Sequence, residues 1–402
     1  MNIGLYINKI SGGLINLPWW GYIVIALTLT HITILSVTIF LHRCQAHRSI
    51  ELNKFISHFF RLWLWLTTGM VTKEWAAIHR KHHAYADQKD DPHSPHVYGI
   101  KEVLKRGAEL YKKETLNKET MEKYGKGTPD DWIEKNIYSK YDTLGIYIML
   151  IIDFILFGFI GITIWAIQMI WIPLFAAGVI NGLGHWFGYR NFENPDKATN
   201  IFPIGIFIGG EELHNNHHTF ATSAKFSKKW YEFDIGWMWI SIMEMCKLAK
   251  VKKKLPKIKI IKEKINHLDI KNLETLILNR YEISVNFANY LKNDFNKELI
   301  KIKEIISNKI IVKNFKKLLI KEKELLTNEE KNIIDFACKE SPILNKIFMM
   351  REELSKIWEK SSLSKNELLI KFQNWCERAE SSGIKNLKNF SKLLRSIQPA
   401  KI

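Results

Sequence analysis

The sequence contains few cysteines, and their placement argues against two common kinds of site. The 402 residues include four, at Cys44, Cys246, Cys338 and Cys376, and no two of them form a Cys-x-x-Cys pair. Cysteines scattered in this way suggest neither a disulfide framework nor a zinc site made of thiolates. We therefore expect reduced thiols, and other side chains must hold any metal.

Acidic residues are also scarce relative to basic ones. The chain has 41 Asp and Glu against 59 Lys and Arg, which gives a formal net charge of +18. Such a charge suits nucleic acid, an anionic lipid surface or a phosphorylated ligand. Basic and acidic residues alternate in the C-terminal part and no nucleic-acid-binding module is recognisable there, so we expect lipid and substrate as partners and no nucleic acid.

Long apolar runs are missing after Lys250. The first 245 residues carry these runs and most of the aromatic residues, whereas the remainder is a mixture of Lys, Ile, Leu, Glu and Asn. We therefore divide the chain into a membrane-embedded part, 1–245, and a basic region of amphipathic helices, 246–402. Helices are expected in that region over 268–294 and 297–326, and a third from Ser364 as N-cap to Gly383.

The first apolar run is long enough to cross a bilayer. Trp19–Leu41 is uncharged, and as a helix its roughly 23 residues would be about 35 Å long. We expect His31, inside this run, to bond to a neighbouring helix and not to a metal. The next apolar segment, Phe55–Val71, is interrupted by His58 and Arg61 and is interpreted as a re-entrant or interfacial helix.

A second long apolar region spans Leu144–Trp186 and has room for two spans, with Gly161 and Pro173 as possible bend or turn positions. The N-terminus does not have the pattern of a signal peptide. A three-span model with the N-terminus outside keeps the histidine-rich segments together on the basic, cytoplasmic side. The expected fold is an all-α integral membrane protein with few transmembrane helices, a cytoplasmic histidine-rich domain and a helical C-terminal extension.

Three histidine clusters are the most informative feature of the sequence. They are His42-x4-His47, His79-x2-His82-His83 and His214-x2-His217-His218. On a helix, residues at i, i+3 and i+4 share one face, so the second and third clusters each direct three imidazoles into one volume. Eight imidazoles suggest two metals. Residues five apart on an α-helix differ by about 140°, so His42 and His47 cannot converge on one atom unless the helix ends between them, and each is predicted to serve a different metal.

Two further residues are placed at this site. His185 follows Asn181 by one helical turn at the end of an apolar run, so we predict His185 as a ninth ligand and Asn181 as the holder of a metal-bound water. Soluble di-iron proteins instead use two Glu-x-x-His pairs. Only Glu211-x2-His214 has that spacing near the clusters. We therefore expect Glu211 and Glu212 beside the site, accepting hydrogen bonds from ligand imidazoles.

A redox-active di-iron centre at a membrane surface, beside apolar helices, points to O2 chemistry on an unactivated hydrocarbon. Zinc could not perform it, because zinc has no redox change. A non-enzymatic metal carrier or scaffold is the alternative of another class. Transporters, however, usually place their ligands within the spans, near mid-membrane, whereas these clusters follow the ends of apolar runs.

The clusters and their surroundings resemble those of the membrane fatty-acid desaturases. The flanking residues are most similar to the acyl-CoA Δ9-desaturase (stearoyl-CoA desaturase) branch, over about residues 17–245, and the C-terminal region resembles that of the bacterial type of this branch. The flanking segments are Glu74-Trp75, Asp91-Pro92-His93, Asn181-Gly-Leu-Gly-His185-Trp-Phe-Gly-Tyr189-Arg190 and Gly210-Glu211-Glu-Leu-His214.

This resemblance implies two iron ions, with Asn181 contributing through water and with the nine histidines as ligands: His42, His47, His79, His82, His83, His185, His214, His217 and His218. It also implies O2-dependent insertion of a cis double bond at C9–C10 of saturated C16 or C18 acyl-CoA, for unsaturated fatty acid biosynthesis. An acyl-phospholipid substrate, or hydroxylation of a lipid or alkane, is the alternative. Electrons would come from a separate ferredoxin, cytochrome or flavoprotein reductase. The expected location is a bacterial inner membrane, with the clusters and the C-terminus cytoplasmic.

Overall fold

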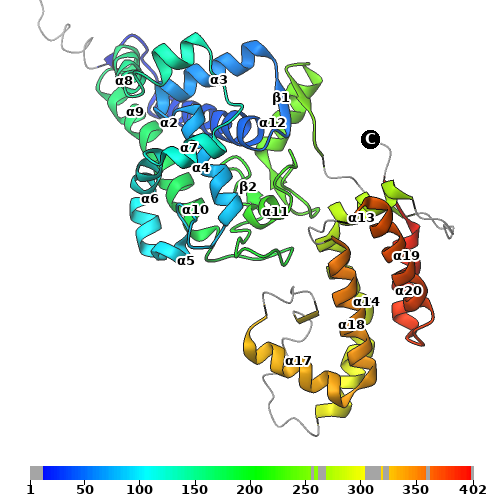
Figure 1. Ribbon diagram of the computed structural model, residues 1–402. Coiled ribbons are helices and arrows are strands. Elements are labelled where there is room, and N and C mark those ends of the chain that lie inside the picture. The colour runs from blue at the N-terminus through cyan, green and yellow to red at the C-terminus, as the bar shows by residue number, and fades with distance from the viewer. Residues whose placement is uncertain are drawn as a thin grey trace, which may run out of the picture. The chain divides into compact units, whose positions relative to one another are not determined.

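The computed structural model describes residues 12–254, 258–260, 269–303, 318–319, 326–358 and 363–399. The chain divides into two compact units. Unit 1 comprises Met1–Asn191 and Asp196–Lys254, and unit 2 comprises Phe192–Pro195 and Leu255–Ile402. Both are predominantly helical, with only short strands among the described residues (Figure 1).

The elements of unit 1 are mostly helices joined by short strands and loops. They are α2 (Trp19–Leu35), η1 (Ser36–Ala46), β1 (Ile50–Leu52), α3 (Lys54–Thr67), α4 (Thr72–Tyr85), α5 (Pro95–Tyr98), α6 (Ile100–Thr115), α7 (Lys118–Tyr124), η2 (Glu134–Tyr138), α8 (Leu144–Phe157), α9 (Phe159–Trp171), η3 (Ile172–Ile180), α10 (Asn181–Leu183), β2 (Ile204–Gly205), α11 (His214–Thr219), β3 (Phe233–Asp234), α12 (Ile235–Met245) and β4 (Ala249–Val251). Strand β1 pairs antiparallel with β4, and β2 pairs parallel with β3.

The first predicted span lies within a longer helix. Together α2 and η1 form a continuous helix, Trp19–Ala46, whose 28 residues are long and apolar enough to cross a membrane. His31 lies in its first half and accepts a hydrogen bond from Nε1 of Trp239, on α12, at 3.0 Å. The expectation that His31 bonds to a neighbouring helix is therefore confirmed.

The second apolar region folds into two antiparallel helices, and its turn is not where we predicted. The chain reverses at Gly158, whose φ of 62° is left-handed, and not at Gly161 or Pro173. Gly161 lies inside α9, where a Cβ would stand 2.0 Å from the carbonyl oxygen of Asp153, so its role is to let α8 and α9 pack closely. Pro173 lies in the first turn of η3 and does not end the helix.

One of the three expected spans is short. Phe159–Leu183 is a continuous helix of 25 residues that could cross a bilayer. In contrast, α8 has 14 residues, about 21 Å, which is less than the roughly 30 Å of a hydrocarbon core. The described residues therefore contain two helices of sufficient length and composition, one fewer than the three-span model requires.

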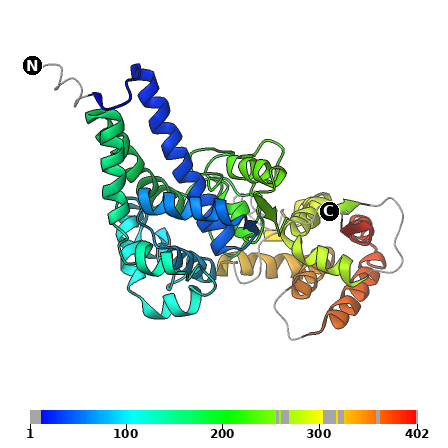
Figure 2. The same ribbon diagram turned by 90° about the horizontal axis from the view of Figure 1, so that it is seen from above.

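The histidine clusters lie at the same end of these long helices. The backbone amides of Leu14 and Ile15 donate to the carbonyls of Ile155 and Leu156 at 3.0 and 2.8 Å, which joins the start of α2 to the α8–α9 turn. In Figure 2 the N-terminal end of α2, in dark blue, and the green helices α8 and α9 project together from the rest of unit 1. The chain leaves the opposite ends of the long helices at the first cluster and at His185.

The predicted re-entrant or interfacial segment forms α3, which begins after the N-cap Asn53. Its buried Arg61 donates from Nη2 to Glu134 at 2.8 Å and from Nη1 to Asp131 at 2.6 Å. Both acidic residues belong to the hydrophilic connector between α4 and α8. These ion pairs hold α3 beside the connector.

Unit 2 packs its helices around a core that includes the fully buried Trp375, Phe372 and Phe390. Its elements are β5 (Ile258–Ile260), α13 (Ile270–Leu278), α14 (Arg280–Lys303), α17 (Asn328–Glu340), α18 (Pro342–Trp358), α19 (Lys365–Glu380), α20 (Lys385–Ser396) and β6 (Ile397–Pro399), with β5 antiparallel to β6.

The helix boundaries expected in unit 2 are partly corrected. The predicted helix 268–294 is two helices, because the chain breaks at Asn279, and α14 continues past 294 to Lys303. Residues 304–317 and 320–325 of the next predicted helix lie outside the described residues. Ser364 is confirmed as the N-cap of α19, in a capping box with Glu367, although this helix ends at Glu380, before Gly383.

Candidate metal centre

Four segments of unit 1 bring histidines to one region. Helix α4 carries the second cluster, and the short helix α11 carries the third. His42 lies in η1, His47 is its C-cap, and His185 follows α10. All nine predicted ligands lie in these segments, which belong to parts of the sequence up to 176 residues apart.

Five of the nine imidazoles converge on one volume. The nitrogen atoms available as ligands lie within 4.8 Å of one another in the set His42, His47, His79, His83 and His217, hereafter the five-histidine group. The Nε2 atoms of His47 and His79 are 2.9 Å apart, and those of His217 and His83 are also 2.9 Å apart. The Nε2 of His42 lies 3.0 Å from that of His217.

The remaining four converge on a second volume. His82, His185, His214 and His218 meet the same 4.8 Å criterion and are hereafter the four-histidine group. The Nε2 atoms of His185 and His214 are 3.0 Å apart, and those of His82 and His218 are 3.3 Å apart. Two clusters of three histidines are thus shared between two groups.

In both the second and the third cluster, the i, i+4 pair belongs to one group and the remaining histidine to the other. The i, i+4 pair of the second cluster, His79 and His83, joins the five-histidine group, and His82 joins the other. In the third cluster the i, i+4 pair, His214 and His218, joins the four-histidine group, and His217 crosses over. The expectation that each cluster directs all three imidazoles into one volume is therefore corrected.

The prediction that His42 and His47 serve different metals is contradicted, because both belong to the five-histidine group and their Nε2 atoms are 3.1 Å apart. The cause is the local helix geometry. Residues 36–46 form a π-helix, and the amide of His47 donates to the carbonyl of His42 at 3.0 Å, an i to i+5 bond. A wider turn places residues five apart almost above one another, which an α-helix does not.

Carboxylates support four of the nine imidazoles. The Nδ1 atoms of His42, His82, His185 and His218 lie 2.5, 3.0, 2.8 and 3.1 Å from Glu211, Asp91, Asp87 and Asp196. A carboxylate on Nδ1 fixes the ring orientation, assigns the proton to Nδ1 and leaves the Nε2 lone pair for a metal. The prediction that Glu211 accepts a hydrogen bond from an imidazole agrees with this contact.

The other two predicted accessory residues behave differently. Glu212 is buried, and its described hydrogen bonds come from the backbone amides of Ile208 and Gly210, at 3.0 and 3.2 Å, and not from an imidazole. It therefore holds the loop before α11, because a buried carboxylate needs donors and these amides are nearest. Asn181 opens α10, four residues before His185, and no described contact tests its predicted water.

The chemistry of the two groups fits a cation in each. Burial lowers the pKa of His47, His79, His83, His214, His217 and His218, so these rings are neutral near pH 7. Burial opposes the charged form of His82 as well, but Asp91 raises its pKa. Aspartates on Nδ1 of both His82 and His218 leave the two Nε2 lone pairs facing each other at 3.3 Å, an arrangement that a cation between them would stabilise. Two nitrogens about 2.1 Å from one ion are separated by about this distance.

Three supporting aspartates were not identified from the sequence as part of the site. Asp87 and Asp91 lie in the acidic segment directly after the second cluster. Burial alone would raise the pKa of each, but both pKa values lie below the ordinary range, because His185 donates a hydrogen bond to Asp87 and His82 forms an ion pair with Asp91. Burial raises the pKa of Asp196. The acidic segment was a usable signal for the first two, whereas nothing local marks Asp196, which is more than 100 residues from Asp87.

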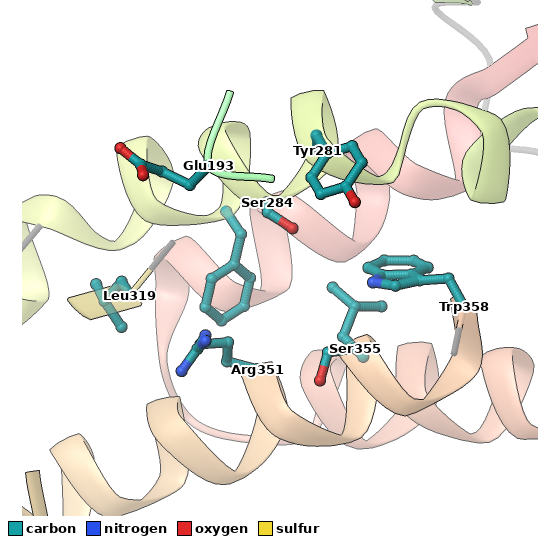
Figure 3. Close-up of a pocket in the computed structure, with 9 residues that line it drawn as sticks. Glu193, Tyr281, Ser284, Leu319, Arg351, Ser355 and Trp358 are labelled. Atoms are coloured by element: carbon teal, nitrogen blue, oxygen red, sulfur yellow. The ribbon is translucent and has the colours of Figure 1, made fainter. Parts of the chain in front are cut away.

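A pocket in unit 2 is lined by side chains of another character. Figure 3 shows Tyr281 and Trp358 near each other in its lining, with Ser355 and Arg351 along α18. Its described lining contains no histidine or cysteine. The pocket therefore does not provide the ligands that a transition metal prefers.

The comparisons with known proteins agree with this site. A family model described as fatty acid desaturase matches residues 17–237, more than half of the chain, and a model described as transposase matches 286–400. Delta-9 acyl-lipid desaturase 1 of Arabidopsis thaliana is 30% identical over 57% of this chain and 74% of its own length. An sn-1 stearoyl-lipid 9-desaturase of Anabaena variabilis is 26% identical, over 61% and 89%. An acyl-CoA 5-desaturase of Anemone leveillei is 27% identical, over 57% and 71%. The chain belongs to the fatty acid desaturase family, and it is a desaturase, an oxidoreductase acting on fatty acyl chains.

Proposed function

We propose that this protein is an O2-dependent Δ9-desaturase that inserts a cis double bond between C9 and C10 of a saturated C16 or C18 acyl chain. The observation that carries the proposal is the convergence of nine histidines into two adjacent groups within the matched region. The names of the Arabidopsis and Anabaena relatives support the Δ9 position.

The five-histidine and four-histidine groups are proposed to hold one iron ion each, with a water on Asn181 completing the second. A bound di-iron pair supplies the redox chemistry that activates O2. The protein's own part is to keep Nε2 of each imidazole unprotonated and correctly oriented. Glu211, Asp91, Asp87 and Asp196 do this for four rings by accepting the Nδ1 hydrogen.

We propose an acyl group carried by a membrane lipid as the substrate. The first relatives are named for acyl-lipid and stearoyl-lipid substrates, which favours this class over the acyl-CoA that the sequence motifs alone suggested. Acyl-CoA is the second candidate, because the Anemone relative is named for it. A reconstituted assay with each substrate distinguishes the two.

The proposed location is a bacterial inner membrane, with the metal centre and unit 2 on the cytoplasmic side. The shared end of the long helices, at which the chain enters the histidine clusters, supports one side of the membrane for all nine histidines. The basic residues Arg43, Arg48, Lys54 and Arg61, which follow the first apolar run, favour the cytoplasm as that side. A separate ferredoxin, cytochrome or flavoprotein reductase is proposed to deliver two electrons for each double bond. The position of the acyl chain against the metal centre would select C9, because only a carbon held near the oxidant reacts.

The test is a fatty-acid profile, with double-bond positions, from a desaturase-deficient host that expresses either the wild type or His82→Ala. We expect a new cis-Δ9 product from the wild type alone, and about one iron fewer per chain in the variant. A hydroxylated product would instead show that the protein is a lipid hydroxylase. Full activity of His82→Ala with both irons retained would refute its role as a ligand.

A further inference from the structure

The carboxylates that support the histidines are unequally divided between the two groups. In the four-histidine group, three of the four imidazoles direct Nδ1 at an aspartate. In the five-histidine group, His42 alone directs Nδ1 at a carboxylate, Glu211, among the residues that the structure describes. Two ions of equal charge would therefore lie in surroundings of different charge.

These carboxylates are close and shielded from water. The side chain of Asp91 is 0% exposed and that of Asp87 is 4% exposed. Each lies one imidazole away from the ion position, where a negative charge interacts more strongly with a trivalent than with a divalent cation. An imidazole that donates to a carboxylate is also a more basic ligand. Both effects favour the higher oxidation state in the four-histidine group, whereas largely neutral imidazoles favour the lower state in the other.

We propose that the two irons are electronically unequal, and that the iron held by His82, His185, His214 and His218 is the more easily oxidised. When one electron from dithionite has been added to the diferric protein, this iron remains ferric and the iron of the five-histidine group has become ferrous. The inference rests on the proposed function, because it needs iron in both groups. Asp87, Asp91 and Asp196 would thus set the reduction potential of one metal position.

Asp87 allows the charge to be removed with little change in structure. Its Oδ2 accepts hydrogen bonds from Nδ1 of His185 at 2.8 Å and from the amide of Lys197 at 2.7 Å, and its Oδ1 accepts from the hydroxyl of Ser94. An asparagine oxygen can accept the first two bonds, and its amide nitrogen can donate to Ser94. The φ of Asp87 is 62°, which asparagine also tolerates. Asp87→Asn therefore removes a charge and keeps the hydrogen-bond pattern.

Glu211→Gln is the matched variant in the five-histidine group. The same oxygen, Oε1, accepts from both His42 and Thr38, so a glutamine oxygen can keep both bonds. If charge sets the potentials, the two variants act with opposite sign. Asp87→Asn raises the reduction potential of the iron in the four-histidine group, which is the lower of the two, and so narrows the difference between the two potentials. Glu211→Gln raises the potential of the iron in the five-histidine group, which is already the higher, and so widens the difference.

The experiment is a stepwise reduction of the full-length protein loaded with iron-57, followed by Mössbauer spectroscopy. In the wild type we expect two quadrupole doublets, one of which converts to ferrous first, so that a half-reduced form accumulates. Removal of one carboxylate charge is expected to change the ferric-to-ferrous ratio of its iron about tenfold, or about 59 mV for one electron. If Asp87→Asn does not assemble, Asp196→Asn removes the corresponding charge beside His218.

The outcomes separate this inference from the proposed function. Two outcomes would overturn the inequality of the irons and leave the function intact. In the first, the wild type desaturates but both of its irons are reduced together. In the second, Asp87→Asn leaves the difference in reduction potential between the irons unchanged or widens it. A wild type that binds no iron and forms no product overturns both.

Discussion

Substitution of Asp234 provides a quantitative test of how the metal centre is held together. Arg43, between the two histidines of the first cluster, donates to Asp234 at 2.9 Å, and both side chains are 0% exposed. The guanidinium also lies 3.9 Å from the centre of the Phe226 ring and donates to the carbonyl of Gly209. The pair joins η1 to the start of α12, whose amide at Trp237 is capped by the same carboxylate.

Asp234→Asn would leave a buried guanidinium without its counter-charge. Removal of one partner from a buried ion pair costs about 3–5 kcal/mol, much of it from the uncompensated charge that remains. For a unit of this size, each kcal/mol lowers the melting temperature by about 2–4 °C, so we expect a fall of about 6–20 °C.

Thermal unfolding of the iron-loaded protein in detergent micelles, followed by tryptophan fluorescence and iron release, measures this effect. Asp335→Asn, at an exposed position of unit 2, is the matched control and should leave the transition unchanged. Arg43→Met combined with Asp234→Asn should recover part of the loss, because no stranded charge remains. A melting temperature of Asp234→Asn equal to that of the wild type would refute the reasoning.

Three further predictions concern the apoprotein and the two units. Burial lowers the pKa of six cluster histidines below 6.5, so the unfolded chain binds more protons than the folded one as the pH falls through 6.5. The iron-free protein should therefore have a lower melting temperature at about pH 5.5 than at about pH 7.5. A higher melting temperature in acid would contradict this. Gly161→Leu should separate α8 from α9 and reduce the yield of folded protein after detergent extraction, whereas Ile160→Ala, at a half-exposed neighbour, should not. Trp375→Ala should cost unit 2 about 3–5 kcal/mol, seen as faster proteolysis within 269–399; unchanged cleavage would argue against the core described for that unit.

The sequence alone was sufficient to locate the histidines that the structure brings together. The i, i+3, i+4 spacing in the second and third clusters places three imidazoles on one helical face, and His185 stands at the end of an apolar run. The first span and the N-cap at Ser364 were predictable for the same reason: they depend on local composition and local hydrogen bonds. The turn at Gly158 was missed because Gly158 and Gly161 lie three residues apart in one apolar run, and only their contacts after folding distinguish the residue at the turn from the residue at the helix–helix contact.

Tertiary structure alone decided how the histidines are divided and what supports them. His82 and His217 each belong to the group opposite to that of their cluster neighbours, because side chains of α4 and α11 meet at both groups. Residue spacing within one helix contains no information on how two helices face each other. His42 and His47 meet because the first long helix widens into a π-helix, which the 3.6-residue period does not predict. Asp87 meets His185, and Asp196 meets His218, through loops distant in sequence. The residue types and local periodicity thus determined which histidines could form a metal site, whereas long-range packing determined that they gather in one group of five and one group of four.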